Sequence, residues 1–313
     1  MTPKNKNGNR ISANLWFNTE AEEAARFYTS LFKNSTLGKV NRYGTEGQEI
    51  HGKPDSTVMT VEFQLENQHF VGLNGGPQFQ INPSISLFIS LGSKEEIDAL
   101  WEGLSEDGKV LMPLDSYPFS EWYGWIQDKY GVSWQLILPG QEGDWRPPIV
   151  PSFLFVGEQC GNAEKAMEFY RSIFKNTESG NIARYGTDQE HDEEGTVMYG
   201  DFAVEGQWFA AMDSAQDHDF EFNEAISFII NCDTQEEVDY YWKKLSADPS
   251  AEQCGWVKDK FGISWQIVPK VLPEMLNDSD PKKSQPVMKA MLQMKKLDIA
   301  ALEKAYKSKK TLQ

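Results

Sequence analysis

The sequence predicts an α+β protein that contains two copies of one small module joined end to end. Segments of the first half recur in the same order in the second half, as expected of an internal duplication. Apolar residues between Ala21 and Phe32 follow helical spacing, whereas Met59–Leu65 alternates apolar and polar residues like a strand with one wet face. Helices and strands within the same copy favour the α+β class.

The duplication can be followed through two well-separated segments. Ala21–Asn34 returns as Ala163–Asn176 after 142 residues, and Gly124–Gln135 returns as Gly255–Gln266 after only 131. The shift decreases because the second copy lacks ten residues, most of Lys109 to Phe119. A connector rich in Gly and Pro separates the copies. The predicted division is a first copy at residues 11–139, a linker at 140–150, a second copy at 151–269 and a C-terminal tail at 270–313.

Each copy is expected to contain two helices that begin at recognisable caps. Thr19, followed three residues later by Glu22, forms a capping box before the first helix. Ser93 and Thr234 have the same spacing to a Glu at the start of the second helix of each copy. We therefore expect both helices in both copies.

Strands occupy the remainder of each copy. Asp128–Gly131 has the composition of a tight turn, with Gly where a positive φ is needed, and Ser133–Ile137 after it reads as a final strand. Each copy then reads as strand, helix and about three strands, followed by the same order again. This pattern describes a doubled βαβββ unit, and the whole chain contains four such units.

The charge and composition exclude several classes of partner. A formal charge of -17 repels phosphate, so we expect no nucleic-acid partner. The first ten residues are polar and no apolar run approaches the length of a membrane span, so we expect a cytoplasmic protein without a membrane partner. Cys160, Cys232 and Cys254 lack close pairing and suit free thiols in the packing.

Three groups of residues form a pattern found in a known family. They are Trp16-Phe17 with Ala21-Glu22 and Phe27-Tyr28, then Leu73 to Pro77, and then Gly255 to Gln266. They resemble the PhnB-like branch of the vicinal oxygen chelate superfamily, which has the glyoxalase and bleomycin-resistance fold. The resemblance implies tandem glyoxalase-like domains, each a curved, cup-like mixed sheet with helices outside. The branch is often named after 3-demethylubiquinone 3-methyltransferase, but the chain has no Gly-rich strand-to-helix loop for a nucleotide-like methyl donor. We do not expect methyl transfer.

In that superfamily the floor of the cup holds a divalent metal. The resemblance places the ligand positions near Ala13, near Ser84 and at Gln135 on strands of the first copy, and near Ser152, near Ala225 and at Gln266 on strands of the second. Alanine cannot ligate, and a neutral amide without imidazole is a poor ligand for a hard cation. We therefore expect no cofactor and no essential metal. His218, between two aspartates, is the remaining metal candidate, although a solvated loop His is the simpler interpretation.

A small-molecule site is the alternative use of the cup. In the final strand of each copy, alternation turns Ser and Gln toward the cup and Trp and Leu away from it. A Trp before the last turn is a candidate wall, and an Arg recurs at a strand end, where it could contact an anion or pair with an acid. The candidate ligand-binding residues are Gln135, Gln266, Ser133, Ser264, Trp125, Trp256, Arg42 and Arg184, and no catalytic residue is identified.

These observations favour a protein that binds a small aromatic or anionic molecule in its cups. Single-copy relatives pair into dimers, so the tandem chain is expected to be a monomeric pseudo-dimer or a homodimer with two unequal sites. A metal-dependent lyase, isomerase or dioxygenase remains the alternative from another class.

The tail differs in charge from the body. Residues 282–313 hold nine Lys against two acids, a charge of +7. Because the whole chain has a charge of -17, the rest of the chain carries -24. This tail could dock on the acidic body or remain solvated. It has apolar residues at helical spacing from Val287 to Leu292, and Asp298 is a predicted cap for a last helix. A scaffold whose tail binds a partner is the third interpretation.

Overall fold

The computed structural model describes residues 10–46, 48–140, 146–187 and 190–308. The first copy contains β1 (Ile11–Phe17), α1 (Ala21–Leu31), β2 (Thr36–Arg42), α2 (Gln48–His51), β3 (Val58–Leu65), β4 (Gln68–Asn74), β5 (Ile85–Ser90), α3 (Lys94–Ser105), β6 (Lys109–Tyr117), β7 (Ser120–Gln127) and β8 (Ser133–Ile137).

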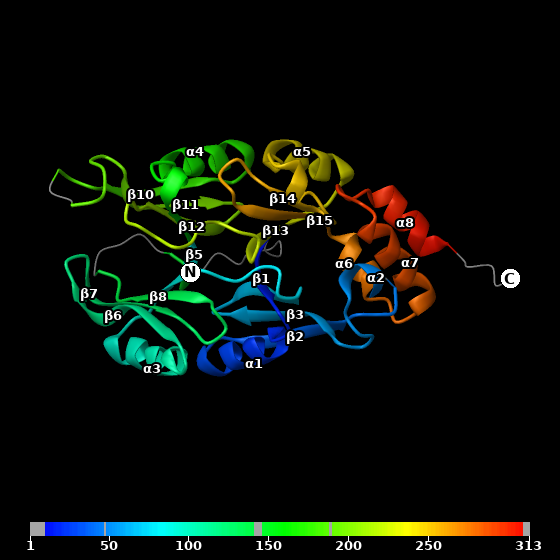
Figure 1. Cartoon of the computed structure of the whole chain (residues 1–313), viewed down its shortest axis with the longest axis horizontal. Helices are drawn as coiled ribbons and strands as arrows, with labels where there is room; N and C mark the ends of the chain where they lie inside the picture. Colours follow the sequence, from blue (N-terminus) through cyan, green and yellow to red (C-terminus); the bar gives the residue numbers. More distant parts are fainter. Residues whose placement is uncertain (1–9, 47, 141–145, 188–189, 309–313) are drawn as a thin grey trace.

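The second copy repeats this order with fewer strands. It contains β9 (Ile149–Phe155), α4 (Ala163–Ile173), β10 (Glu178–Arg184), β11 (Val197–Val204), β12 (Gln207–Asp213), β13 (Ile226–Cys232), α5 (Gln235–Leu245), β14 (Trp256–Lys258) and β15 (Ser264–Pro269). The tail forms α6 (Val271–Leu276), α7 (Pro281–Leu292) and α8 (Ile299–Lys307). The strands lie in the middle of the molecule, with α4 and α5 along one side and α1 and α3 along the other (Figure 1).

The strands form two sheets, and each sheet contains strands of both copies. Sheet A has seven strands in the order β14-β15-β13-β1-β4-β3-β2, and sheet B has eight in the order β10-β11-β12-β9-β5-β8-β7-β6. The copies join where β1 pairs antiparallel with β13 and β9 with β5. The mixed α+β class is confirmed, but the expectation that each copy builds its own cup is corrected. Each sheet combines the first half of one copy with the second half of the other.

The pairing between copies satisfies the edges of the strands. Without a partner on its second side, β1 would leave a row of backbone N–H and C=O groups unpaired, and β13 satisfies them. The helices pack on strands of their own copy, as α1 does on β3 and α4 on β11, and buried residues of both copies belong to one hydrophobic core. The two copies are therefore joined both by strand pairing and by side-chain packing.

A buried carboxylate ties the two halves of each copy together. Tyr28 on α1 and Trp134 on β8 both donate to Asp128 Oδ2, at 2.8 and 2.7 Å. Burial raises the pKa of Asp128 to about 6, while these donors and two backbone N–H groups oppose the shift. The second copy repeats the arrangement with Tyr170, Asp259 and Trp265.

The predicted helix caps are partly confirmed. The side chains of Ser93 and Thr234 accept from the backbone N–H three residues later, as the capping boxes require. The box at Thr19 is wrong, because α1 begins at Ala21 and Asn74 Oδ1 accepts from the Ala21 N–H at 2.8 Å. A long-range cap from β4 thus replaces the local one, and Asp213 caps α4 in the same way.

The tail packs on the second copy. Its three helices share a small core of Leu272, Val287, Leu297 and Leu302. The backbone N–H groups of Cys254 and Gly255 donate to carbonyls at Met294 and Lys295, and Lys296 pairs with Asp239 at 2.6 Å. The tail lies at the β14 edge of sheet A (Figure 1). Because the second copy lacks a counterpart of β6, the tail covers an edge that a further strand covers in sheet B.

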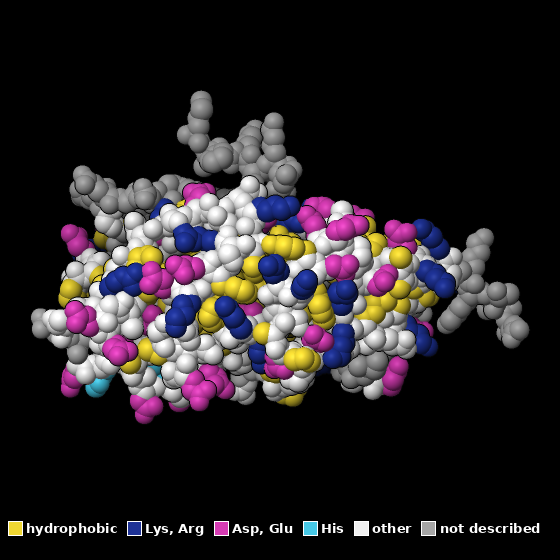
Figure 2. Space-filling model, turned by 90° about the horizontal axis from the view of Figure 1, so that it is seen from above, with side chains coloured by type: hydrophobic (Ala, Val, Ile, Leu, Met, Phe, Trp, Pro, Cys, Tyr) yellow, Lys and Arg dark blue, Asp and Glu magenta, His cyan; other side chains and the backbone are white. Residues whose placement is uncertain are grey.

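The described surface carries charges of both signs, and the cysteines form no disulfide. Acidic and basic side chains are interspersed over the face seen from above (Figure 2). The three cysteines are free, and Cys232 is the one that is buried. None of the described helices combines the length and the apolar character needed to cross a bilayer.

Candidate functional site

Each sheet has an inner face, which is the face turned away from helices α1, α3, α4 and α5. On β1 the residues Ile11, Ala13, Leu15 and Phe17 belong to the hydrophobic core, so Ser12, Asn14 and Trp16 occupy the inner face. Asn14 pairs with Ser227 on β13, and Ser227 pairs with Ser264 on β15. These three residues form the polar row of sheet A across adjacent strands.

Sheet B repeats this row at equivalent positions. Ser152 on β9 pairs with Ser86 on β5, and Ser86 pairs with Ser133 on β8. The polar row of sheet B is therefore Ser152, Ser86 and Ser133. Both rows are almost completely buried.

Several positions expected from the resemblance are shifted. Ala13 lies in the hydrophobic core, and its neighbour Asn14 takes the inner-face position on the first strand. On β5 and β13 the inner positions are Ser86 and Ser227, which are two residues beyond Ser84 and Ala225. The alternation within Ile11–Phe17 was the signal that could have located Asn14.

The two glutamines lie on the inner faces in different surroundings. Gln135 Nε2 donates to Ser86 Oγ at 2.6 Å, and its Oε1 accepts from the Tyr123 hydroxyl at 2.6 Å. Burial raises the pKa of Tyr123, so its hydroxyl remains a donor. Gln266 Nε2 donates to Ser227 Oγ at 3.0 Å, but the counterpart of Tyr123 is Cys254 in a loop. Among the described residues, Gln266 Oε1 accepts no hydrogen bond from a side chain.

The hydrogen-bonding capacity of the two rows also differs. In the polar row of sheet A, Asn14 Nδ2 and Ser264 Oγ are buried without a partner among the described residues. The side chains are 2% and 1% exposed. In sheet B, Ser133 Oγ accepts from Trp125 Nε1 at 2.7 Å, and the unpartnered atom is Ser152 Oγ. A buried polar atom without a partner is costly and indicates water or a ligand at that place.

Two indole rings lie over the polar row of sheet A. Trp16 follows Asn14 along β1 on one side of the row, and Trp256 pairs with Gln266 on the other side. Their ring centroids are nevertheless 6.0 Å apart in an edge-to-face contact, so the rings meet across the row. In sheet B the position of Trp16 is taken by Leu154, and Trp125 is bonded to Ser133.

The two arginines lie apart from both rows. Arg184 Nη2 pairs with Glu164 Oε1 on α4 at 2.6 Å, and Arg42 Nη1 donates to the Ser56 carbonyl at 3.0 Å. Arg184 Nη1 donates likewise to the Gly195 carbonyl. Each arginine therefore contacts the loop that follows its strand, and Arg184 lies on the helix side of sheet B.

The polar rows and the two glutamines offer poor ligands for a divalent metal. Asn14, Ser227 and Gln266 in sheet A, and their counterparts in sheet B, are all neutral. Within the described ranges, no three His, Cys, Asp or Glu side chains are grouped to hold a metal. His218 is held by Ser214 Oγ at 2.9 Å, and burial lowers its pKa. The residues present do not fit the superfamily's metal.

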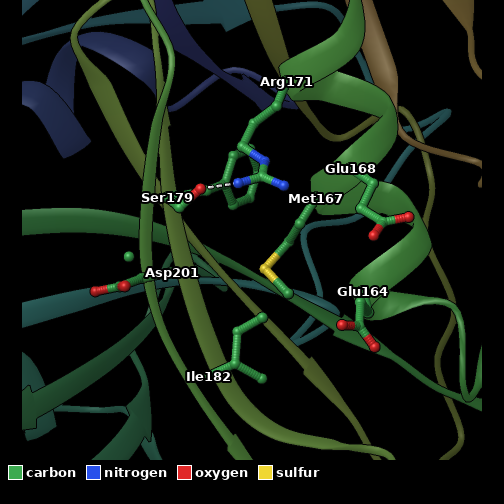
Figure 3. Close-up of a pocket in the computed structure, with 9 residues that line it drawn as sticks. Glu164, Met167, Glu168, Arg171, Ser179, Ile182 and Asp201 are labelled. Atoms are coloured by element: carbon green, nitrogen blue, oxygen red, sulfur yellow. Dashed lines mark hydrogen bonds between the residues drawn. The ribbon is translucent and has the colours of Figure 1, made fainter.

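Two hollows lie away from the polar rows. The larger, about 830 Å³, is lined by loop residues around Gln80, Gly157 and His218. The smaller, about 50 Å³, lies between α4 and β10, where Arg171 donates to Ser179 Oγ (Figure 3). A volume of that size holds water rather than a metabolite.

Comparison with known proteins identifies similar families and structures. The model of the family described as 3-demethylubiquinone-9 3-methyltransferase matches residues 9–137 and 147–268. Among solved structures, a putative 3-demethylubiquinone-9 3-methyltransferase, PhnB protein, from Bacillus cereus is 42% identical, covering 41% of this chain and 98% of its own, with a TM-score of 0.38.

Two further solved structures differ in sequence identity and in the share of this chain that they cover. A Staphylococcus aureus protein is 34% identical over 42% of this chain and 97% of its own, with a TM-score of 0.18. A glyoxalase I mutant from Zea mays is 11% identical over 83% of this chain and 94% of its own, with a TM-score of 0.48. No curated protein matches the chain.

Proposed function

Because the chain belongs to the family described as 3-demethylubiquinone-9 3-methyltransferase, whose model matches both copies, we propose that it binds a small, uncharged aromatic molecule on the inner face of sheet A, without an essential metal. The observation that carries this proposal is a pair of buried polar atoms in one row, Asn14 Nδ2 and Ser264 Oγ, which have no hydrogen-bond partner among the residues that the structure describes.

The polar groups suit a molecule that both accepts and donates hydrogen bonds. The Asn14 amide can donate, Gln266 Oε1 can accept, and the Ser264 hydroxyl can do either. Asn14 and Ser264 lie two strands apart, a separation of about 10 Å. One substituted aromatic ring spans that distance, so a single small molecule can satisfy both ends of the row.

The surroundings favour an uncharged ligand. Lys258, which pairs with Ser264 across the sheet, is already bound to Glu224 at 2.6 Å. Arg42 and Arg184, the expected contacts for an anion, lie outside the row. Trp16 and Trp256 supply flat apolar surface, on which an aromatic ring can stack or meet edge to face. An anion placed there would be desolvated without a free cation among these residues.

The family name describes methyl transfer, which would need a bound methyl donor. The chain carries no Gly-rich strand-to-helix loop to cradle such a donor. The groups around the polar row of sheet A are hydrogen-bonding and aromatic, which supports recognition of a ring. Binding is therefore the function we propose.

Fluorescence titration can test the proposal, because Trp16 and Trp256 would contact the ligand. The probes are 4-hydroxybenzamide, which is uncharged and carries its polar groups at opposite ends of the ring, and its carboxylate counterpart 4-hydroxybenzoate, as the lead pair in a panel of matched amides and acids. We expect saturable quenching by amides, at least tenfold weaker binding of the acids, and loss of binding in Asn14→Leu and Ser264→Ala.

The chain provides a matched control. Ser133→Ala changes the counterpart of Ser264 in sheet B and should leave amide binding unchanged. Tighter binding of the acids, or equal loss in Ser133→Ala and Ser264→Ala, would contradict the proposal.

A further inference from the structure

The inner face of sheet B is already occupied by a side chain of the connector. Arg146 precedes β9, and its guanidinium carbon lies 3.7 Å from the centroid of the Trp208 ring on β12. Its Nε donates to Asp201 Oδ2 at 2.7 Å and its Nη2 to Asp201 Oδ1 at 3.2 Å. The planar cation is thus stacked on one side and held by two hydrogen bonds at its edge.

The residues that hold Arg146 are built into the sheet. Asp201 pairs with Ala210, and Ala210 pairs with Ser152, so the carboxylate continues the polar row of sheet B. Asp201 is only 4% exposed, and its Oδ1 also accepts from the Asn181 N–H at 2.6 Å. Figure 3 shows Asp201 directed away from the side chains of α4, in agreement with an inner-face position.

Apolar and aromatic groups complete the surroundings. Trp208 belongs to a separate cluster of buried residues on this face, against which Tyr199 and Phe88 pack. The Tyr199 hydroxyl approaches Asp201 Oδ2 at 3.4 Å. A buried carboxylate beside two aromatic rings is a recognised arrangement for binding a planar cation.

The equivalent place in sheet A is different. Glu62 and His69 stand where sheet B has Asp201 and Trp208, with 3.8 Å between His69 Nε2 and Glu62 Oε2. Their side chains are 36% and 30% exposed, so this carboxylate is hydrated. The enclosed cation site is therefore a feature of sheet B.

We propose that the inner face of sheet B is a binding site for a planar guanidinium-type cation, and that Arg146 fills it as an internal ligand. The two inner faces then serve different chemistry: sheet B holds a cation supplied by the chain, and sheet A takes an external molecule. The inference stands apart from the proposed function, because it concerns the other sheet and other residues.

Chemical rescue of Arg146→Ala tests this site. Ethylguanidinium has the same non-hydrogen atoms as the part of the side chain that the substitution removes, and ethylurea is its uncharged counterpart. At constant ionic strength and millimolar concentrations, we expect ethylguanidinium to raise the melting temperature of Arg146→Ala in a saturable way. Ethylurea and propylammonium should not, and wild-type protein should respond to none of the three.

A second substitution locates the effect. Adding Asp201→Asn to Arg146→Ala removes the carboxylate and should abolish the response to ethylguanidinium. An equal response to ethylurea, an equal response of the wild type, or no response of Arg146→Ala would overturn the proposal. If Arg146→Ala does not fold alone, refolding is followed by circular dichroism: recovery with ethylguanidinium only supports the site, and recovery with neither compound overturns it.

Discussion

Replacing Ser133 by alanine should destabilise the protein and replacing Ser264 by alanine should not, although the two serines are counterparts in the repeat. Both are buried inner-face residues at the end of a polar row. Ser133 Oγ accepts from Trp125 Nε1 at 2.7 Å, whereas Ser264 Oγ has no partner among the described residues. The same chemical change therefore removes a hydrogen bond in one sheet and an unsatisfied group in the other.

The magnitudes follow from the hydrogen-bond inventory. Ser133→Ala loses one hydrogen bond and leaves the half-buried indole N–H of Trp125 unpaired, a loss of about 1 to 2 kcal/mol. Ser264→Ala removes a desolvated hydroxyl and leaves a void of one oxygen atom, so we expect no loss and a gain of up to about 1 kcal/mol. The two variants should thus differ by about 2 kcal/mol.

Urea unfolding of both variants beside the wild type measures this difference. The midpoint should decrease for Ser133→Ala and stay level or increase for Ser264→Ala, with the dependence on urea unchanged. Equal losses in the two variants would refute the reasoning, because Ser264 Oγ would then be satisfied as well as Ser133 Oγ is.

Three further outcomes are expected. Tyr28→Phe removes a donor to Asp128, whose pKa is about 6 when folded, so its cost should be greater at pH 7.5, about 2 kcal/mol, than at pH 5, about 1 kcal/mol; the opposite order in urea unfolding would contradict this. Because the folded pKa of Asp128 lies above its unfolded value of 3.8, the contribution of this carboxyl to stability decreases as the pH rises from about 4 through the folded pKa of about 6. Leu297→Ala, in the tail core, should cost about 2 to 4 kcal/mol, and a loss below 0.5 kcal/mol would show that the tail is not packed. Treatment with EDTA should leave the melting temperature unchanged, and stoichiometric zinc, nickel or iron in the purified protein would argue for a metal enzyme.

The sequence was sufficient for the elements because the signals are local. Ser93 and Thr234 cap their helices through groups three residues away, and the alternation in Met59–Leu65 gives the face of β3. Thr19 failed as a cap because α1 begins only at Ala21, whose N–H donates to Asn74, far along the chain, while the Thr19 hydroxyl donates to Glu20. Local spacing carries no information about such a distant partner.

The pairing of strands was beyond the reach of the sequence. The repeat shows which segments are equivalent, but equivalent edges can pair within a copy or between copies, and the same residues line both arrangements. Arg146 was missed for a similar reason, since a connector residue gives no sign that it will lie on Trp208. Gln135 and Gln266 could be assigned to the inner faces because the period of a strand is two.

The pairing of β1 with β13 and of β9 with β5 has a consequence for how such a gene can change. Expressed alone, each half of the duplication would present two strand edges that are paired in the whole chain, and we expect it to pair with a second copy of itself. A cut in the connector, by contrast, should leave two fragments that remain associated. The strands that pair between the copies are therefore expected to change together in evolution, whereas the residues of the two inner faces can diverge.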